Sequence, residues 1–164
     1  MCGIVGGISD NNIAPLLLDG LNRLEYRGYD SAGIIVLSKN NKFDLARSVG
    51  KVKVLENNLK VRKNKIKGNI GIAHTRWATH GEPSNRNAHP HVSKNSVSVV
   101  HNGIIENYLE LKKSQLNHGY KFLSETDTEV IAHEIDLNLR LDNSLISSVQ
   151  NAIKSLKGSY GLGV

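Results

Sequence analysis

The chain has 164 residues, of which 39% are hydrophobic, and carries a formal net charge of +6 at neutral pH. This length supports one domain with a sizeable core, and no apolar run approaches the roughly 18 residues that a membrane span needs. The single cysteine excludes a framework of internal disulfides, which favours the reducing cytoplasm as the compartment and no membrane partner.

The positive charge has a local source. Cationic side chains are concentrated between positions 51 and 67, as Lys51, Lys53, Lys60, Arg62, Lys63, Lys65 and Lys67. A nucleic-acid-binding surface is one interpretation. Only 5% of the residues are aromatic, however, so few side chains could stack on bases. We therefore favour a solvated helical face and expect no nucleic-acid partner.

The first half of the chain mixes strands and helices. Uncharged or β-branched runs predict strands at residues 3–8, 32–37 and 70–74, and a hairpin-like turn at Asn40-Asn41 predicts a further strand at residues 43–49. Apolar residues at helical spacing, with Pro15 in the first turn, predict a helix that ends at Tyr26-Arg27-Gly28. A modest second helix is expected at residues 52–59, inside the basic stretch.

The second half begins with a long polar segment. Residues 75–95 show almost no apolar periodicity, and a structureless stretch of this size inside a domain is usually functional. A strand is expected next, at residues 96–100. Three helices then follow, at residues 104–117, 126–139 and 144–156, and Thr126 and Glu129 give the second of them capping-box spacing.

These elements predict the fold class. Strands and helices do not alternate regularly, which argues for α+β layers rather than a doubly wound parallel sheet. The chain ends inside an apolar, glycine-rich run, residues 160–164, that has the composition of a strand. Because domains seldom end inside a strand, we expect residues 1–164 to be a single domain cut from a longer protein.

The cysteine is Cys2, directly after the initiator methionine. Methionine aminopeptidase removes Met1 when the next side chain is small, so we expect Cys2 to become the N-terminus. An α-amine titrates at about 7.7–8.0 and a thiol at about 8.5, so the amine could take the thiol proton and activate the sulfur as a nucleophile. The alternative is a small buried hydrophobic residue, which is common for a lone cysteine.

A second set of candidate residues lies where the strand at 70–74 ends. Arg76 could clamp a carboxylate with two parallel hydrogen bonds, and Trp77 could cover the apolar part of a ligand. The alternatives are an arginine in a surface ion pair and a tryptophan in the core.

Two further candidate groups follow later strands and loops. Asn102 and Gly103 could supply an amide NH₂ and a backbone N–H to the oxyanion of an acyl-transfer intermediate. A tight Asn-Gly turn is the alternative. Asp127 could bind a substrate ammonium group, and its alternative role is capping of the helix that starts there.

Seven histidines raise the question of a metal, especially His89-Pro90-His91 together with His80. Without cysteine partners they lack a recognisable zinc-ligand spacing, so no metal is expected. The chain also contains no P-loop lysine motif and no dinucleotide-binding fingerprint, and we expect no cofactor.

Taken together, the motifs resemble those of one family. In chain order they are MCGIVG (residues 1–6), RLEYRGYDSAG (23–33), AHTRWATHG (73–81), NAHPH (87–91), HNGIIEN (101–107) and SETDTE (124–129). These blocks run in family order across most of the chain and closely resemble the glutaminase domains of the class II glutamine amidotransferases, most of all those of the amino-sugar-forming branch.

The resemblance implies a four-layer αββα sandwich of the N-terminal-nucleophile hydrolase type, with two antiparallel sheets between helical layers. It also implies hydrolysis of L-glutamine to glutamate and ammonia through a γ-glutamyl thioester. Cys2 is then the nucleophile, its α-amine is the base, and Asn102 and Gly103 form the oxyanion hole.

By the same resemblance, other residues recognise the amino-acid part of glutamine. Arg76 and Thr79, with help from His80, would hold the α-carboxylate, and Asp127 would hold the α-amino group. Trp77 is expected to belong to a mobile loop that closes over the site.

Proteins of this branch continue into a sugar-phosphate isomerase region, which residues 1–164 do not include. The resemblance implies that the full-length enzyme is a homo-oligomer, binds fructose 6-phosphate only through that region, and uses the ammonia to make glucosamine 6-phosphate. The sequence leaves two other classes open: a basic nucleic-acid-binding module, and a regulatory domain that binds glutamine without turnover.

Overall fold

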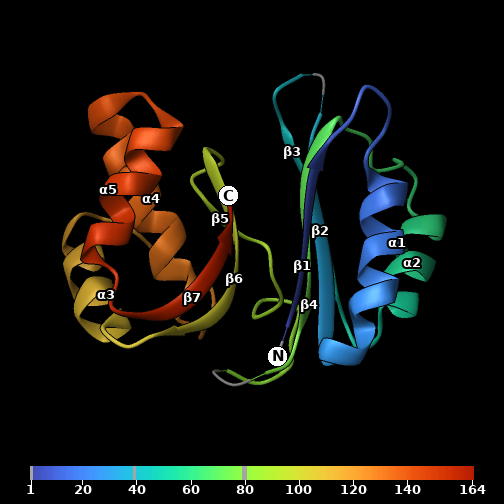
Figure 1. The fold of residues 1–164 in the computed structure, drawn as a ribbon, viewed down its shortest axis with the longest axis horizontal. Coiled ribbons are helices and arrows are strands. Elements are labelled where there is room, and N and C mark those ends of the chain that lie inside the picture. The colour runs from blue at the N-terminus through green and yellow to red at the C-terminus, as the bar shows by residue number, and fades with distance from the viewer. Residues whose placement is uncertain (1, 39, 79–80) are drawn as a thin grey trace.

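The computed structural model describes residues 2–38, 40–78 and 81–164. Within them the chain folds into four layers, with two sheets face to face between two layers of helices (Figure 1). One outer layer holds α1 (Ala14–Leu24) and α2 (Val52–Val61). The other holds α3 (Tyr108–Asn117), α4 (Thr128–Asp142) and α5 (Leu145–Ser155). This αββα arrangement confirms the predicted α+β class and the layer order that the resemblance implies.

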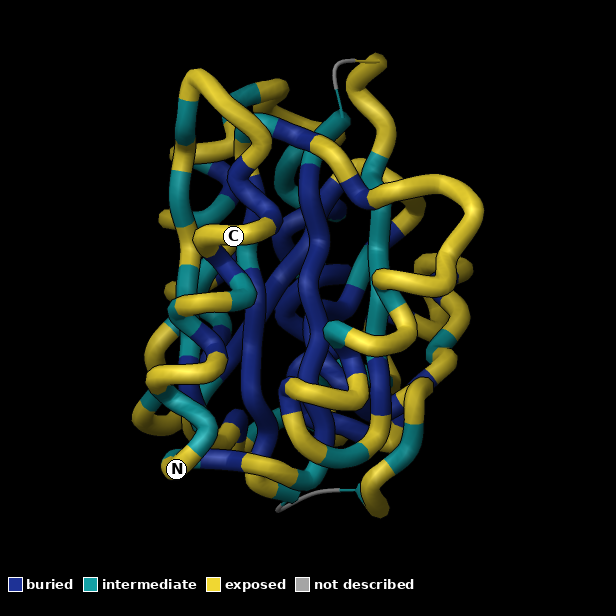
Figure 2. Tube along the Cα trace, turned by 90° about the vertical axis from the view of Figure 1, so that its right-hand side faces the viewer, coloured by how far each residue is buried: buried dark blue, intermediate teal, exposed yellow. Residues whose placement is uncertain are grey.

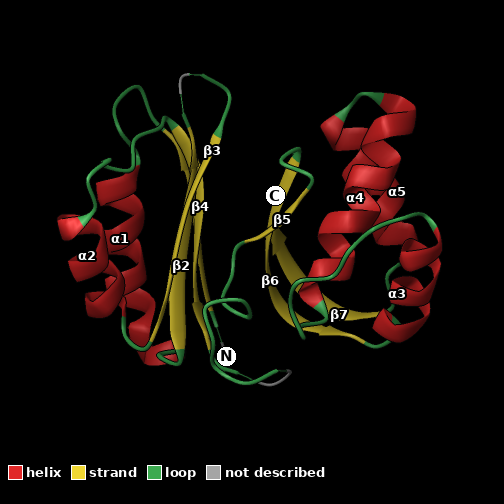
Figure 3. Cartoon of the chain, turned by 180° about the vertical axis from the view of Figure 1, so that it is seen from behind, coloured by secondary structure: helices red, strands yellow, loops and turns green. Residues whose placement is uncertain are grey.

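Both sheets are antiparallel over the described residues. The first has the strand order β1 (Gly3–Ile8), β4 (Ile70–Arg76), β2 (Ser31–Leu37) and β3 (Phe43–Val49). The second has the order β5 (His91–Ser93), β6 (Val97–Ile105) and β7 (Gly158–Gly163). Seen from behind, the strands of both sheets lie between the helical layers, and the N-terminus lies near the lower ends of the sheets (Figure 3).

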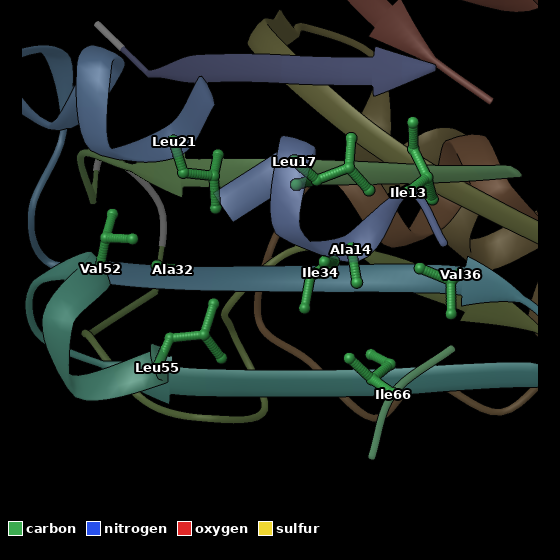
Figure 4. Packing of buried hydrophobic residues seen from close by; sticks show 11 residues of the cluster. Ile13, Ala14, Leu17, Leu21, Ala32, Ile34, Val36, Val52, Leu55 and Ile66 are labelled. Carbon is green, nitrogen blue, oxygen red and sulfur yellow. The ribbon is translucent and has the colours of Figure 1, made fainter. Parts of the chain in front are cut away.

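Apolar side chains of α1 and α2 pack on the outer face of the first sheet (Figure 4). Helix α1 has Pro15 in its first turn and buries Leu17 and Leu21, which are one turn apart. Helix α2 adds Val52 and Leu55. Full burial of each such side chain stabilises the fold by about 1.5–3 kcal/mol.

A second apolar cluster lies between the second sheet and α3, α4 and α5. It includes Val99 and Ile105 of β6 and Ile131 and Ile135 of α4, all fully buried. Figure 2 shows the buried strands in the middle of the molecule and mostly exposed residues around them. Each cluster therefore joins one sheet to its own helices, and neither fills the space between the two sheets.

The basic stretch lies on the outer surface. All seven cationic side chains between positions 51 and 67 are exposed, on α2 and on the segments that flank it. They form the solvated face that the sequence predicts. Among the described residues, no helix combines the length and the apolar character that crossing a membrane requires.

The structure differs from the sequence predictions between positions 75 and 107. Strand β4 continues to Arg76, and the polar segment contains β5, so this segment is not wholly irregular. Strand β6 runs on to Ile105, and α3 begins only at Tyr108. The prediction of a helix from residue 104 was wrong because residues 100–105 pair with β7, far away in sequence. The Asn-Gly turn is excluded by the same pairing.

Candidate active site

Cys2 directly precedes β1, whose first residue, Gly3, pairs with Thr75 of β4. The Cys2 thiol is partly exposed, and its Sγ accepts a hydrogen bond from the Trp77 backbone N–H at 3.2 Å. Gly3 N–H donates to Thr75 Oγ1 at 3.1 Å. A Cβ atom on Gly3 would lie 2.7 Å from Leu24 Cβ, so this position requires glycine. The sulfur is thus held at the edge of the sheet in a polar setting, and Cys2 is not a buried hydrophobic residue.

Asn102 and Gly103 approach Cys2 from β6 of the other sheet. Asn102 Nδ2 donates to the Cys2 carbonyl oxygen at 2.9 Å. Gly103 has φ +132°, and a Cβ there would lie 2.2 Å from Ser159 O on β7. Glycine therefore allows the close approach of β7, and the pair sits within a strand rather than at its end.

Arg76 is buried at the end of β4. Its side chain is 4% exposed, and its guanidinium donates to the carbonyl oxygens of Gly81 at 3.0 Å and Glu82 at 3.4 Å. Burial lowers the pKa of the guanidinium, and the nearby Cys2, Asp30 and Asp127 oppose this shift. An arginine remains charged at neutral pH under these conditions. The surface alternative is therefore wrong for Arg76.

Trp77 is 44% exposed, so the core alternative is wrong for this residue. Its ring meets Tyr29 edge-on, with 5.4 Å between the ring centroids. The next residue, Ala78, donates its N–H to Asp30 Oδ2 at 2.8 Å. The segment after β4 is thus attached through residues of the 23–33 block.

Asp127 stands at the N-cap position of α4, yet its side chain makes no capping bond to the described residues of that helix. Its Oδ2 atom accepts from Ile105 N–H at 2.9 Å, and Oδ1 lies 4.0 Å from His101 Nδ1. Glu129 does not form the predicted capping box either, because its carboxylate accepts from the N–H groups of Leu123 and Ser124. The capping alternative is therefore wrong, and Asp127 is directed toward β6.

These groups enclose one small cavity of about 30 Å³. Its lining includes Cys2, Arg76, Trp77, Gly103 and Asp127. A cavity of this volume holds about one water molecule. A larger groove of about 470 Å³ adjoins it and shares Cys2, Trp77 and Gly103.

The structure thus brings together all the predicted site residues that it describes, whereas Thr79 and His80 lie outside the described residues.

A cluster of buried histidines adjoins the cavity, and His89 is part of its lining. His74 and His89 stack with 4.1 Å between ring centroids, and His91 meets His89 edge-on at 4.8 Å. Burial lowers the pKa of His74 to about 4 and holds the pKa values of His89 and His91 well below the ordinary value. These rings are therefore uncharged at neutral pH. Among the described residues, no group of three or more His, Cys, Asp or Glu side chains could hold a metal ion.

Sequence reasoning missed several residues that hold this site together. They are Asp30, His74, Thr75 and Asn87, each of which makes a hydrogen bond to a distant segment. All four lie within the motif blocks, and membership of a block was the sequence feature that could have identified them. Their roles are contacts across the fold, which residue spacing does not reveal.

A sequence profile of the glutamine amidotransferase domain matches residues 74–164. The chain therefore belongs to the glutamine amidotransferase domain family. It is 53% identical over 164 residues to a glutamine–fructose-6-phosphate aminotransferase (isomerizing) of Haemophilus influenzae, covering 100% of this chain and 26% of that protein. The protein of the same name from Haemophilus ducreyi is 56% identical over 161 residues, with 98% and 26% covered. The chain thus spans about a quarter of the length of these relatives.

A solved structure supports the same class. The glutamine phosphoribosylpyrophosphate amidotransferase from B. subtilis, complexed with ADP and GMP, aligns with a TM-score of 0.76 and 30% sequence identity. The alignment covers 98% of this chain and 34% of that chain. The fold is accordingly that of the N-terminal-nucleophile amidotransferases, as the resemblance implies.

Proposed function

We propose that the chain hydrolyses L-glutamine to glutamate and ammonia through a γ-glutamyl thioester on Cys2. One observation carries the proposal. The thiol, a buried arginine and a buried aspartate line the same cavity, which suits an amino acid whose two charged ends are held while its side chain meets a nucleophile.

The proposed reaction starts with removal of Met1, which frees the α-amine of Cys2. The amine takes the thiol proton, and Sγ attacks the Cδ carbonyl carbon of glutamine. Asn102 Nδ2 and Gly103 N–H stabilise the resulting oxyanion. When the intermediate collapses, the Cδ–N bond breaks and ammonia leaves with the proton from the α-ammonium. Water, deprotonated by the α-amine, then attacks the thioester and releases glutamate and the free thiol.

Recognition is assigned to the charged lining. Arg76 binds the α-carboxylate of glutamine, together with Thr79 and His80, and Asp127 binds the α-amino group. The cavity of about 30 Å³ is too small for glutamine. We propose that Trp77, which lines both this cavity and the adjoining groove, moves when the substrate enters and then covers it.

The proposal also extends to a longer protein. The relatives are named for amino transfer to fructose 6-phosphate, and the chain spans 26% of each. We propose that residues 1–164 are a single glutaminase domain whose ammonia serves glucosamine 6-phosphate synthesis. Fructose 6-phosphate binds outside this domain, and the full-length enzyme is a cytoplasmic homo-oligomer.

A comparison of processed and unprocessed protein tests this function. Ammonia release from glutamine is measured for chains that begin at Cys2, for chains that retain Met1, and for Cys2→Ala. Only the processed protein should turn over, because a peptide bond removes the basicity of the Cys2 nitrogen. Loss of the nucleophile should lower kcat by roughly 10⁶-fold.

Two results would contradict the proposal. Equal turnover with and without Met1, with thiol titration showing intact Cys2 in both samples, would eliminate the amine as the base. Glutamine binding by the processed chain without ammonia release would instead identify a regulatory domain.

A further inference from the structure

We infer that His74 is a positioning residue that fixes the orientation of the Asn102 amide toward the reacting carbonyl. The inference rests on the proposed function, because it concerns the donor assigned to the oxyanion. His74 itself does not line the cavity around Cys2.

His74 joins the two sheets at the point where the chemistry is proposed. It lies on β4 of the first sheet, is 0% exposed, and its Nε2 atom is 3.0 Å from Asn102 Oδ1 on β6. The same Nε2 atom is 3.1 Å from the carbonyl oxygen of His101. The Asn102 amide continues the connection, because its Nδ2 atom donates to the Cys2 carbonyl oxygen. Nucleophile and amide donor come from different sheets, so this chain of contacts sets their relative placement.

The carbonyl oxygens at the two ends of this series of hydrogen bonds determine which atoms between them carry hydrogens. The His101 carbonyl can only accept, so His74 Nε2 must carry a hydrogen. The Asn102 atom that faces this N–H must then be the oxygen. The NH₂ group consequently faces the Cys2 carbonyl, which also can only accept. If the amide were rotated by 180°, Asn102 Oδ1 would face the Cys2 carbonyl oxygen, and the Asn102 NH₂ group would face the His74 N–H.

The opposite side of the His74 ring supports a role beyond packing. Nδ1 is buried and has no hydrogen-bond partner among the described residues, and the ring stacks on His89. A neutral imidazole has one N–H, and Nε2 requires it, so the Nδ1 acceptor is left unpaired. A buried unpaired nitrogen is destabilising, and an apolar side chain would avoid this cost. The arrangement is explained by the hydrogen bond that Nε2 gives to Asn102.

The consequence for catalysis follows from the geometry of the amide. One of the two Asn102 N–H groups is used by the Cys2 carbonyl, and the other remains for the oxyanion. Without His74 the amide can rotate and direct its oxygen at the developing negative charge. Because the oxyanion forms only when Sγ attacks and is absent from bound glutamine, loss of His74 should lower kcat and leave KM nearly unchanged.

The test compares kcat and KM of processed protein for His74→Leu, His74→Gln and His74→Asn. His74→Leu should lower kcat about tenfold, the value of one or two neutral hydrogen bonds, with KM within about twofold of wild type. The amide nitrogen of a glutamine reaches about as far as Nε2, so His74→Gln should recover most of kcat. The shorter asparagine should not, and this pair decides the matter even if the leucine variant fails to fold.

Gln115→Leu is the matched control for loss of a buried polar side chain. Gln115 is also buried, and its Nε2 donates two hydrogen bonds, to Val130 O and Glu134 Oε2, away from the cavity. This variant should lower the melting temperature and leave kcat unchanged. An equal fall of kcat in Gln115→Leu and His74→Leu would overturn the inference.

A double variant separates this inference from the proposed function. In the Asn102→Ala background His74→Leu should have almost no further effect on kcat, because no amide is left to orient. Equal fold losses in both backgrounds would overturn the role of His74 while leaving the oxyanion assignment intact. If Asn102→Ala alone leaves kcat unchanged, the oxyanion assignment fails and the role of His74 fails with it.

Discussion

The two halves of the candidate site are built in different ways. In the proposed catalytic half, Asn102 and Gly103 lie on β6, and Cys2 directly precedes β1. Its parts are joined by hydrogen bonds between β4, β6 and the residue before β1, such as His74 to Asn102 and Asn102 to Cys2. Strand positions that are buried and paired open only with large parts of the fold.

The recognition half depends on loops. The guanidinium of Arg76 is bound to the carbonyl oxygens of Gly81 and Glu82. Asn87, which is 0% exposed, donates to Glu82 O at 3.0 Å and to Glu125 Oε2 at 3.1 Å, and it accepts from Glu125 N–H at 2.9 Å. One side chain thus ties the segment after Arg76 to the segment that leads to Asp127.

The difference between the two halves suggests a division of labour between catalysis and substrate binding. The groups proposed to face the transition state are held by contacts between the sheets, and the groups proposed to bind the substrate are held by contacts with loops. Substitutions in the catalytic half should therefore lower kcat, and those in the recognition half should raise KM.

The largest effect among the variants that probe this division is expected for Asn102→Ala. Loss of an oxyanion donor should lower kcat by about 10²–10³-fold, with little change in glutamate or glutamine binding. Melting temperature is measured on the same samples. A fall in stability with unchanged kcat would make Asn102 a structural residue of β6 and would remove the basis for the division.

Arg76→Ala and Asp127→Ala should come next. Each removes a charged hydrogen bond to the substrate, worth roughly 1.5–3 kcal/mol, which raises KM on the order of 10- to 100-fold. Wild type should also prefer glutamine strongly over 4-aminobutanamide, which lacks the α-carboxylate. This preference should nearly vanish in Arg76→Ala, and if it persists, the carboxylate is bound elsewhere.

Asn87→Ala should have a smaller effect of the same kind. Because it loosens the connection between the two loops without touching the substrate, KM should rise roughly three- to tenfold while kcat changes little. Asn107→Ala is the matched control, since Asn107 likewise bonds Ser155 O and Lys157 N–H at 2.9 Å each, on the other side of the second sheet. If kcat falls in Asn87→Ala and KM stays constant, the loops and the strands are not separate in function.

Mild acid should have the smallest effect on the contacts that His74 makes in folded molecules. The pKa of His74 is lowered to about 4, so its ring remains neutral down to about pH 5. The unfolded chain binds this proton at about pH 6.5. The contribution of His74 is therefore fully present above pH 6.5 and is lost as the pH falls toward 4, by about 3 kcal/mol. Urea unfolding between pH 7 and 4.5 should show this loss, and His74→Leu should reduce it.

Much of the fold was accessible from local sequence patterns. The apolar spacing around Leu17 and Leu21 predicted α1, and the uncharged runs predicted β1 and β2 within one residue of their bounds. The short β5 was missed, because its three residues carry no apolar periodicity and are defined by pairing with β6.

The site could be predicted only in part. The residue types at Cys2, Arg76 and Asp127 indicated their chemistry, and the resemblance assigned their roles. Local rules misread the surroundings, since Asn102-Gly103 had the composition of a turn and Asp127 that of a helix cap. Long-range contacts decided both cases: pairing with β7 extends the strand, and Ile105 N–H takes the Asp127 carboxylate. The positioning role of His74 depends on a neighbour in another sheet, which no spacing rule reveals.

The most direct test of the account is covalent labelling with 6-diazo-5-oxonorleucine, an electrophile that mimics glutamine. Intact mass before labelling reports removal of Met1, and peptide mapping afterwards identifies the residue that reacts. We predict one adduct per processed chain, on Cys2. Glutamine should slow its formation, and the fraction of labelled chains should equal the fraction of ammonia release that is lost. An adduct on another residue, or full turnover by protein whose Cys2 is labelled, would contradict the proposal that Cys2 is the nucleophile.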